Sequence, residues 1–203
     1  MTMKQIKKIE TTLDFLYETL SWTNLNYFTV KTLFQATHNG YNLFHNSFFF
    51  ASYQAMLNET LIGLSKLIVE HPDSISFDYL LNLVEHSCKH FPHASKEEIQ
   101  KSVTSHRQKI QNYQALTSKI KSQRDLSLAH SDRKLITQLD FIASEPFIVL
   151  DEIEDLIEYM LSMLNTYSLY LNQSEYDLSH MTERAQQDVS YLVSIYVEKL
   201  TSM

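Results

Sequence analysis

The stretch KIQNYQALTSKIKSQRDLSLAHSD, residues 109–132, carries a helical pattern that turns from apolar to polar without a break signal. Its apolar residues recur at spacings of three and four, as on one face of a helix; they are Ile110, Tyr113, Leu116 and Ile120. The same face continues through Arg124, Ser127 and Ser131. An arginine at the end of an apolar face is costly unless it is paired or used. Either the helix emerges into solvent there, or the polar end of this face is a functional site.

The rest of the chain favours long helices. The 203 residues include only 2 Gly and 3 Pro, which disfavours a sheet with many tight turns. The region from Ser95 to about Ala129 contains neither residue type, so we predict one unbroken helix that begins at a capping box of Ser95 and Glu98. Other apolar stripes predict helices over about 4–20, 23–35, 41–69, 77–86, 151–172 and 180–200.

These elements predict an all-α protein, a single-domain bundle of five to seven helices. The segment 41–69 is apolar nearly all round, as expected of a helix at the centre of a bundle. We predict a helical extension over 1–40, the bundle itself over 41–172, and a C-terminal helix over 173–203 that packs on the bundle.

Composition also limits the compartment. A single cysteine, Cys88, excludes an intramolecular disulfide and fits a reducing environment. No run of apolar residues is long enough to cross a bilayer, and the Lys-rich N-terminus has no signal-peptide apolar core. We therefore predict a soluble cytoplasmic protein with no membrane partner.

The charge is unevenly distributed. The net charge is −7, which argues against a general nucleic-acid coat protein. Residues 96–134 nevertheless carry 9 Lys and Arg against 4 Asp and Glu, whereas residues 135–203 carry 2 against 12. Two interpretations stay open: the basic and acidic helices pair with each other, or the basic segment is an anion-binding face.

A histidine-rich region, residues 86–93, contains one spacing that is compatible with a metal site. His86 and His90 are four residues apart, a spacing that can bind zinc on one helix face. Pro92 interrupts the helix before His93, and no carboxylate lies at ligand spacing. We favour exposed histidines at a helix end. No Glu-x-x-His occurs in the chain, which disfavours a di-metal carboxylate bundle, and we predict neither a metal nor a cofactor.

The polar end of the first stretch resembles a known motif. Arg124-Asp125, four further residues and His130, followed by Ser131-Asp132, are similar to the Arg-polar-x(n)-His motif of the HEPN superfamily. More narrowly, the chain resembles the AbiU-type abortive-infection branch, which favours Arg-Asp-Lys-x-x-Ala-His-x-Asp. The residues retained are Arg124, Asp125, Ala129, His130 and Asp132. Leu126 stands where the branch usually has a basic residue. With its flanking helices, the resemblance spans most of residues 41–172.

The resemblance implies a HEPN-like helical bundle that acts as a metal-independent endoribonuclease, often a toxin or phage-defence effector. It also implies that the protein is a homodimer and that its substrate is an RNA such as tRNA or mRNA. An antitoxin or a nucleotidyltransferase is the further protein partner that it implies.

The residue types suit that chemistry. His130 titrates near neutrality and can act as base or acid, and Arg124 offers a planar two-pronged donor to phosphate. Asp125 can orient either side chain. Lys121, Ser127 and Ser131 are the residues that we expect to bind substrate.

The spacing favours a dimer. Six residues of helix correspond to about 9 Å of rise and about 240° of rotation, so Arg124 and His130 of one chain diverge. A two-fold axis beside this segment would bring two arginines and two histidines into one cleft. Three alternatives stay open: a structural role for His130, a non-catalytic HEPN-like module that binds nucleotide or partners with a nucleotidyltransferase, and a plain helical interaction protein.

Overall fold

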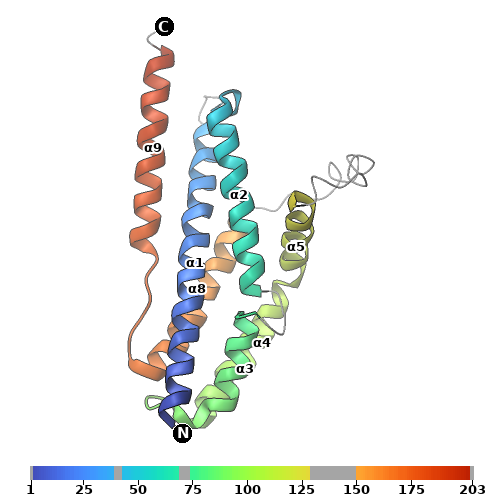
Figure 1. The fold of residues 1–203 in the computed structure, drawn as a ribbon, viewed down its shortest axis with the longest axis vertical. Coiled ribbons are helices and arrows are strands. Elements are labelled where there is room, and N and C mark those ends of the chain that lie inside the picture. The colour runs from blue at the N-terminus through green and yellow to red at the C-terminus, as the bar shows by residue number, and fades with distance from the viewer. Residues whose placement is uncertain (1, 39–42, 69–73, 129–149, 202–203) are drawn as a thin grey trace. The chain divides into compact units, whose positions relative to one another are not determined.

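The computed structural model describes residues 2–38, 43–68, 74–128 and 150–201. Seven α-helices and two short 3-10 helices account for nearly all of these residues, and no strand occurs among them (Figure 1). The predicted all-α class is therefore confirmed. None of the described helices has an 18-residue window apolar enough to cross a bilayer.

The chain forms two compact units. The first unit comprises residues 1–20 and 64–176, and the second comprises residues 21–63 and 177–203. Two of the three boundaries between these segments fall inside helices, because α1 (Thr2–His38) and α2 (Ser47–Ile68) each contribute residues to both units; the third lies between residues 176 and 177, outside any helix. The functional division into 1–40, 41–172 and 173–203 stays a prediction.

The first unit is built on α8 (Leu150–Asn172), which the sequence predicted to within a residue. Ten of its side chains are buried on one broad face. The helices α3 (Phe77–Ser87) and α4 (Lys96–Asn112) form a hairpin through the 3-10 helix η2 (Cys88–His90), as Figure 1 shows.

Local sequence determines where this hairpin's helices begin. The Ser76 hydroxyl accepts a hydrogen bond from the Tyr79 backbone N–H at the start of α3. The predicted capping box of α4 is confirmed: Glu98 N–H donates to the Ser95 hydroxyl, and the Ser95 backbone N–H donates to the Glu98 carboxylate. Together these caps satisfy donors that every helix start leaves unpaired.

Several predicted elements have different boundaries in the structure. The helix predicted over 41–69 begins at Ser47, after the 3-10 helix Leu43–His45. The helix predicted from Ser95 to Ala129 is broken at Tyr113 into α4 and α5 (Gln114–Leu128). Tyr113 has φ −91° and ψ 4°, and its N–H turns to the carbonyl of Ile110, three residues back. The helices predicted over 4–20 and 23–35 are instead one continuous helix, α1.

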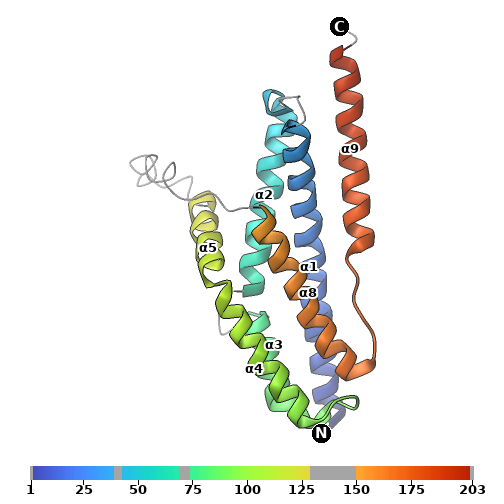
Figure 2. The same cartoon turned by 180° about the vertical axis from the view of Figure 1, so that it is seen from behind.

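The second unit joins the later part of α1, the 3-10 helix η1 (Leu43–His45), most of α2 and α9 (Ser179–Thr201). An extended segment, 173–178, leads from α8 to α9 (Figure 2). The core of the unit is Leu33, Leu43 and Phe49, against which α9 packs Val189, Val193 and Tyr196.

Polar and small residues complete this second unit. Asn24 of α1 donates to the Thr182 hydroxyl of α9 at 2.8 Å. Gly63 of α2 packs so closely on α1 that a Cβ atom there would overlap Thr23 Oγ1. Phe48 and Phe50 of α2 are exposed at 64% and 49%, so the start of α2 is not buried all round as its sequence suggested.

Candidate functional site

Arg124 lies near the C-terminal end of α5 and contacts its neighbour in sequence. Its Nε lies 2.9 Å from Asp125 Oδ1, and its Nη2 lies 2.5 Å from the same oxygen. The Arg124 side chain is 23% exposed and that of Asp125 is 54% exposed. A pair this accessible contributes at most about 1 kcal/mol to stability, so its main consequence is to orient the guanidinium.

The helix that carries this pair is held by its apolar face. The hydroxyls of Thr117 and Ser118 both donate to the Gln114 carbonyl in the first turn of α5. Leu116 and Ile120 are buried at 6% and 0% exposure. The next position of this face is Arg124 near the end of α5, and its side chain remains 23% exposed.

Of the other predicted site residues, some lie on α5 and some lie outside the described residues. Lys121 is exposed on α5, one turn before Arg124, and Ser127 lies in the last described turn of that helix. His130 and Ser131 lie outside the described residues. The described part of α5 ends at Leu128, so the separation of Arg124 from His130 stays a prediction.

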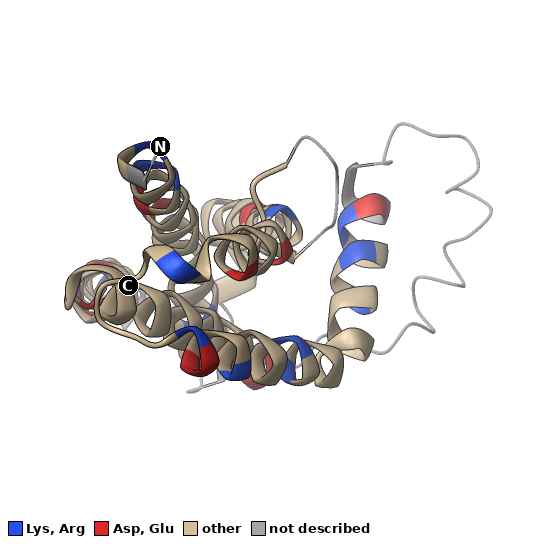
Figure 3. Cartoon of the chain, turned by 90° about the horizontal axis from the view of Figure 1, so that it is seen from below, with Lys and Arg blue, Asp and Glu red and all other residues tan. Residues whose placement is uncertain are grey.

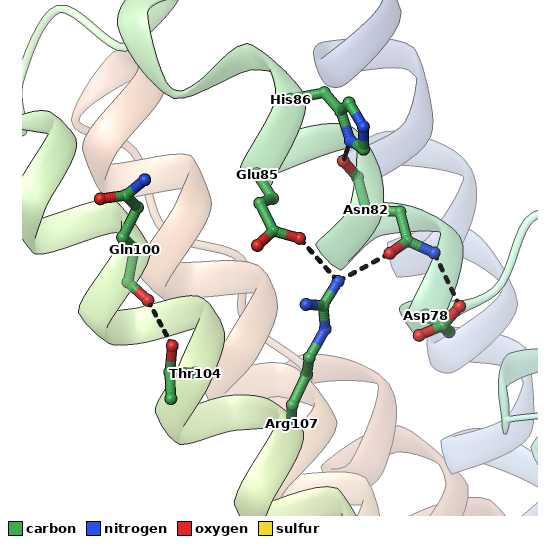
Figure 4. Close-up of polar contacts among 7 residues, drawn as sticks. All are labelled: Asp78, Asn82, Glu85, His86, Gln100, Thr104 and Arg107. Carbon is green, nitrogen blue, oxygen red and sulfur yellow. Dashed lines mark hydrogen bonds and ion pairs between the residues drawn. The ribbon is translucent and has the colours of Figure 1, made fainter.

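A second arginine, Arg107 of α4, is held by the neighbouring helix α3. Its Nη2 lies 2.9 Å from Glu85 Oε2 and donates to Asn82 Oδ1 at 2.7 Å. The Asn82 amide in turn donates to Asp78 Oδ2 at 2.8 Å, so one polar chain runs along α3 (Figure 4). Because the carboxylate and amide occupy this guanidinium, Arg107 serves the α3–α4 hairpin.

Some basic residues of the segment 96–134 pair with acidic side chains, and others remain exposed to solvent. Lys119 and Glu152 form an ion pair at 3.8 Å, as Arg107 and Arg124 do with their own carboxylates. By contrast, four exposed lysines of α4 and α5 make no ion pair with another described residue; they are Lys96, Lys101, Lys109 and Lys121. Basic positions recur along both helices (Figure 3). Part of the segment therefore pairs internally, and part stays exposed to solvent.

An aromatic cluster joins α4 to α8, and the sequence did not single it out. Tyr159 of α8 stacks on His106 at 5.9 Å and on Tyr113 at 5.5 Å between ring centroids. Lys109 Nζ lies 4.3 Å from the centroid of the Tyr159 ring. His106 also packs at 5.4 Å on Tyr167, which is fully buried. The residues Ile99, Val103, His106, Ile110 and Tyr113 follow helical spacing, which was the available signal.

Burial changes the protonation of this cluster. The pKa of His106 is lowered from its ordinary value of 6.5 to about 4, mainly by burial and further by the charge of Lys109. Burial raises the pKa of Tyr159 to about 12. The Tyr159 hydroxyl lies 3.3 Å from His106 Nδ1 and donates to the His106 carbonyl at 3.1 Å. A neutral, enclosed imidazole of this kind is a packing element at neutral pH.

The histidine-rich region has no metal-like arrangement. His86 is exposed at the end of α3, and its Nδ1 lies 2.7 Å from the Asn82 carbonyl. Across the ranges that the structure describes, no three side chains of His, Cys, Asp or Glu are arranged to hold a metal ion. The His86 ring therefore has a local backbone contact of the kind expected for a histidine at a helix end.

One comparison with known proteins gives a match. The family model HEPN_AbiU2, described as AbiU2, matches residues 6–192. No curated protein and no solved structure matches the chain. The matched range includes Arg124, Asp125 and His130, and it covers both ends of the resemblance seen in the sequence.

Proposed function

Because this chain belongs to the AbiU2 family of HEPN proteins, we propose that it is a metal-independent endoribonuclease that acts in abortive infection. The observation that carries the proposal is the pair of Arg124 and Asp125 at the end of α5, followed in sequence by His130. The guanidinium is oriented by a neighbour, and the Arg124 side chain as a whole remains 23% exposed, as suits a phosphate-binding arginine.

The reaction transfers a phosphoryl group within the RNA strand. The ribose 2′-oxygen attacks the adjacent phosphorus, the bond from phosphorus to the 5′-oxygen breaks, and a 2′,3′-cyclic phosphate and a 5′-hydroxyl result. A base removes the 2′-proton, and an acid supplies a proton to the 5′-oxygen. His130 suits either role because an imidazole titrates near neutrality.

Arg124 would stabilise the charge that develops on the phosphate oxygens. Asp125 holds Nε and one terminal nitrogen of the guanidinium, which leaves other N–H groups for a phosphate. Asp125 is thus proposed as a positioning residue. Lys121, one turn earlier and exposed, would add positive charge beside the scissile phosphate, and Ser127 and Ser131 would donate hydrogen bonds.

Full activity uses two histidines, because one imidazole cannot act as base and acid in the same step, and a site with a single His130 keeps only part of the proton-transfer catalysis. A homodimer with its two-fold axis beside this segment would supply one from each chain. Arg124 of one protomer would then act with His130 of its partner.

The test is cleavage of total RNA and of tRNA by the purified protein, with and without EDTA. We expect products with 2′,3′-cyclic phosphate and 5′-hydroxyl ends, no effect of EDTA, and loss of activity in His130→Ala. His86→Ala is the matched control, because His86 is an exposed histidine at a helix end of the first unit. Loss of cleavage in EDTA that a divalent ion restores would contradict the mechanism. Absence of cleavage, with a nucleotidyltransferase that copurifies, would favour the non-catalytic module.

A further inference from the structure

The helix α9 has an exposed stripe that its own unit does not cover. Leu192 and Ile195 are 51% and 45% exposed, and Tyr191 beside them is 67% exposed. Asp188 precedes this apolar pair by one turn, and Lys199 follows it by one turn. The spacings of four, three and four residues align Asp188, Leu192, Ile195 and Lys199 on one helix face.

This stripe is separate from the face that packs in the second unit. The packed positions are Ala185, Val189, Val193 and Tyr196. At 100° per residue, the stripe lies about 90° around the helix from those positions. The unit's own core is therefore complete without Leu192 and Ile195, which with Tyr191 leave adjoining apolar side chains on the surface of α9.

We propose that a second copy of this chain packs on the stripe, with the two α9 helices antiparallel. A two-fold axis between residues 193 and 194 sets Leu192 against the partner's Ile195, and Ile195 against the partner's Leu192. The same alignment sets Asp188 against the partner's Lys199, and this ion pair occurs twice. The stripe is thus complementary to itself in shape and in charge, as an isologous interface requires.

The order of the charges determines the direction of the pairing. A parallel pair would place Asp188 against Asp188 and Lys199 against Lys199, and like charges in register oppose association. Only the antiparallel pair places opposite charges at both ends of the apolar centre. The Asp188 carboxylate lies 3.9 Å from Arg184 Nε in the same helix, and both side chains are more than 70% exposed, so that contact is weak.

Aromatic contacts also link the packed face of α9 to α2. Phe48, 64% exposed, packs on Phe49 at 5.6 Å between ring centroids, and Phe49 packs on Tyr196 at 5.1 Å. A helix pair centred on Leu192 and Ile195 is smaller than a standard interface, which covers about 800 Å² on each partner. We therefore expect a dimer that dissociates on dilution.

This pairing is independent of the proposed ribonuclease activity. The stripe lies in the second unit, whereas Arg124 lies in the first. Ile195 and Lys199 also lie beyond the residues that the family model matches. If copies also pair beside Arg124, pairing through α9 raises the assembly above a dimer, and a change in the stripe removes only that step.

The first test exchanges the charges and measures the molar mass by light scattering over a dilution series. Asp188→Lys and Lys199→Asp should each weaken self-association about tenfold, because each creates two like-charge contacts across the axis. The double variant Asp188→Lys/Lys199→Asp should recover wild-type association. Rescue identifies pairing between chains, because the two positions are three helical turns apart in one chain.

Ile195→Glu is the stronger variant and should abolish this step of association, while Ser190→Glu on exposed surface of the same helix is its control.

A crosslinking experiment tests whether the two α9 helices pair in the antiparallel direction. Cys88 is replaced by serine in two chains, one of which carries Asp188→Cys and the other Lys199→Cys. Antiparallel pairing predicts disulfides only when the two chains are mixed, and parallel pairing predicts them in each chain alone. A monomeric wild-type protein at high micromolar concentration, an unchanged mass in Ile195→Glu, or no rescue by the double variant would overturn the proposal.

Discussion

Two groups of ionisable side chains in the first unit differ in burial and in how strongly their pKa values are shifted. The aromatic cluster of His106, Tyr159 and Tyr167 is enclosed between α4 and α8, and its pKa values are strongly shifted. The pair of Arg124 and Asp125 lies at the exposed end of α5.

The strongly shifted pKa values of His106 and Tyr159 belong to a buried packing cluster and not to the proposed site at Arg124. Shifted pKa values often mark active sites, but burial alone also produces them. The side chains of the aromatic cluster are largely buried and pack α4 against α8. The exposed pair contributes little to stability and is accessible to an anion. Each of the following changes tests whether stability and activity separate between the two places.

The largest expected effect is on stability, at Tyr167. Its side chain is 0% exposed, so Tyr167→Ala should lower the free energy of unfolding by about 3–5 kcal/mol. Its hydroxyl has no hydrogen-bond partner among the described residues. Tyr167→Phe should therefore be neutral or stabilising, because an unsatisfied buried hydroxyl is costly. Urea unfolding measures both, and a Phe variant as damaged as the Ala variant would refute this account of the cluster.

The next effect is on activity, and it tests how two chains share the site. Arg124→Ala and His130→Ala should each lower RNA cleavage by about 10²-fold or more. A mixture of the two variants, after subunit exchange, contains dimers with one intact Arg124 and one intact His130 on opposite chains. Some cleavage should return in these mixed dimers. Exchange demonstrated with two different tags, but without recovered cleavage, would exclude cooperation across the two-fold axis.

A smaller effect concerns pH. The folded-state pKa of His106 is about 4, below its ordinary value of 6.5, so in this interval the unfolded chain binds a proton that the folded chain does not. Stability should therefore fall as the pH is lowered from 6.5 to 4, by about 1–2 kcal/mol after allowance for solvent near the ring. His106→Gln should reduce this pH dependence, and the exposed control His86→Gln should leave it unchanged. Equal pH dependence in all three proteins would contradict the assignment.

The smallest effect is expected at Arg107. Its ion pair with Glu85 joins side chains that are 38% and 43% exposed. A double-mutant cycle of Arg107→Ala and Glu85→Ala should give a coupling energy of about 0–1 kcal/mol. RNA cleavage should be retained in both variants, because this arginine serves the α3–α4 hairpin. A loss of cleavage comparable with that of Arg124→Ala would place Arg107 in the substrate site.

Sequence reasoning succeeded where a local rule decides the structure. The Ser95–Glu98 capping box and the apolar stripe of α8 depend on neighbours in sequence, and both were predicted. The end of α4 depends instead on tertiary packing. Tyr113 has no Gly or Pro beside it, and its ring stacks on Tyr159, 46 residues later in the sequence.

The same reason explains α1 and His106. The sequence predicted two helices over 4–20 and 23–35, but Thr23 and Asn24 are buried in the second unit against Gly63 and Thr182, and the helix continues. For His106, the spacing of three and four was visible in the sequence, but the partner helix was not. Arg124 and Asp125 were selected from the sequence because their residue types match the motif. The contact between their side chains could not be predicted in the same way.

The most direct measurement is RNA cleavage and thermal midpoint together, in the wild-type protein and in Arg124→Ala and Arg124→Lys. The proposed role predicts that both variants lose about 10²-fold or more of the cleavage rate, since an ammonium lacks the planar fork. It also predicts a thermal midpoint near that of the wild type, because the pair with Asp125 is exposed. Cleavage retained in Arg124→Ala, or lost only together with the fold, would contradict the claim that this arginine acts on the substrate.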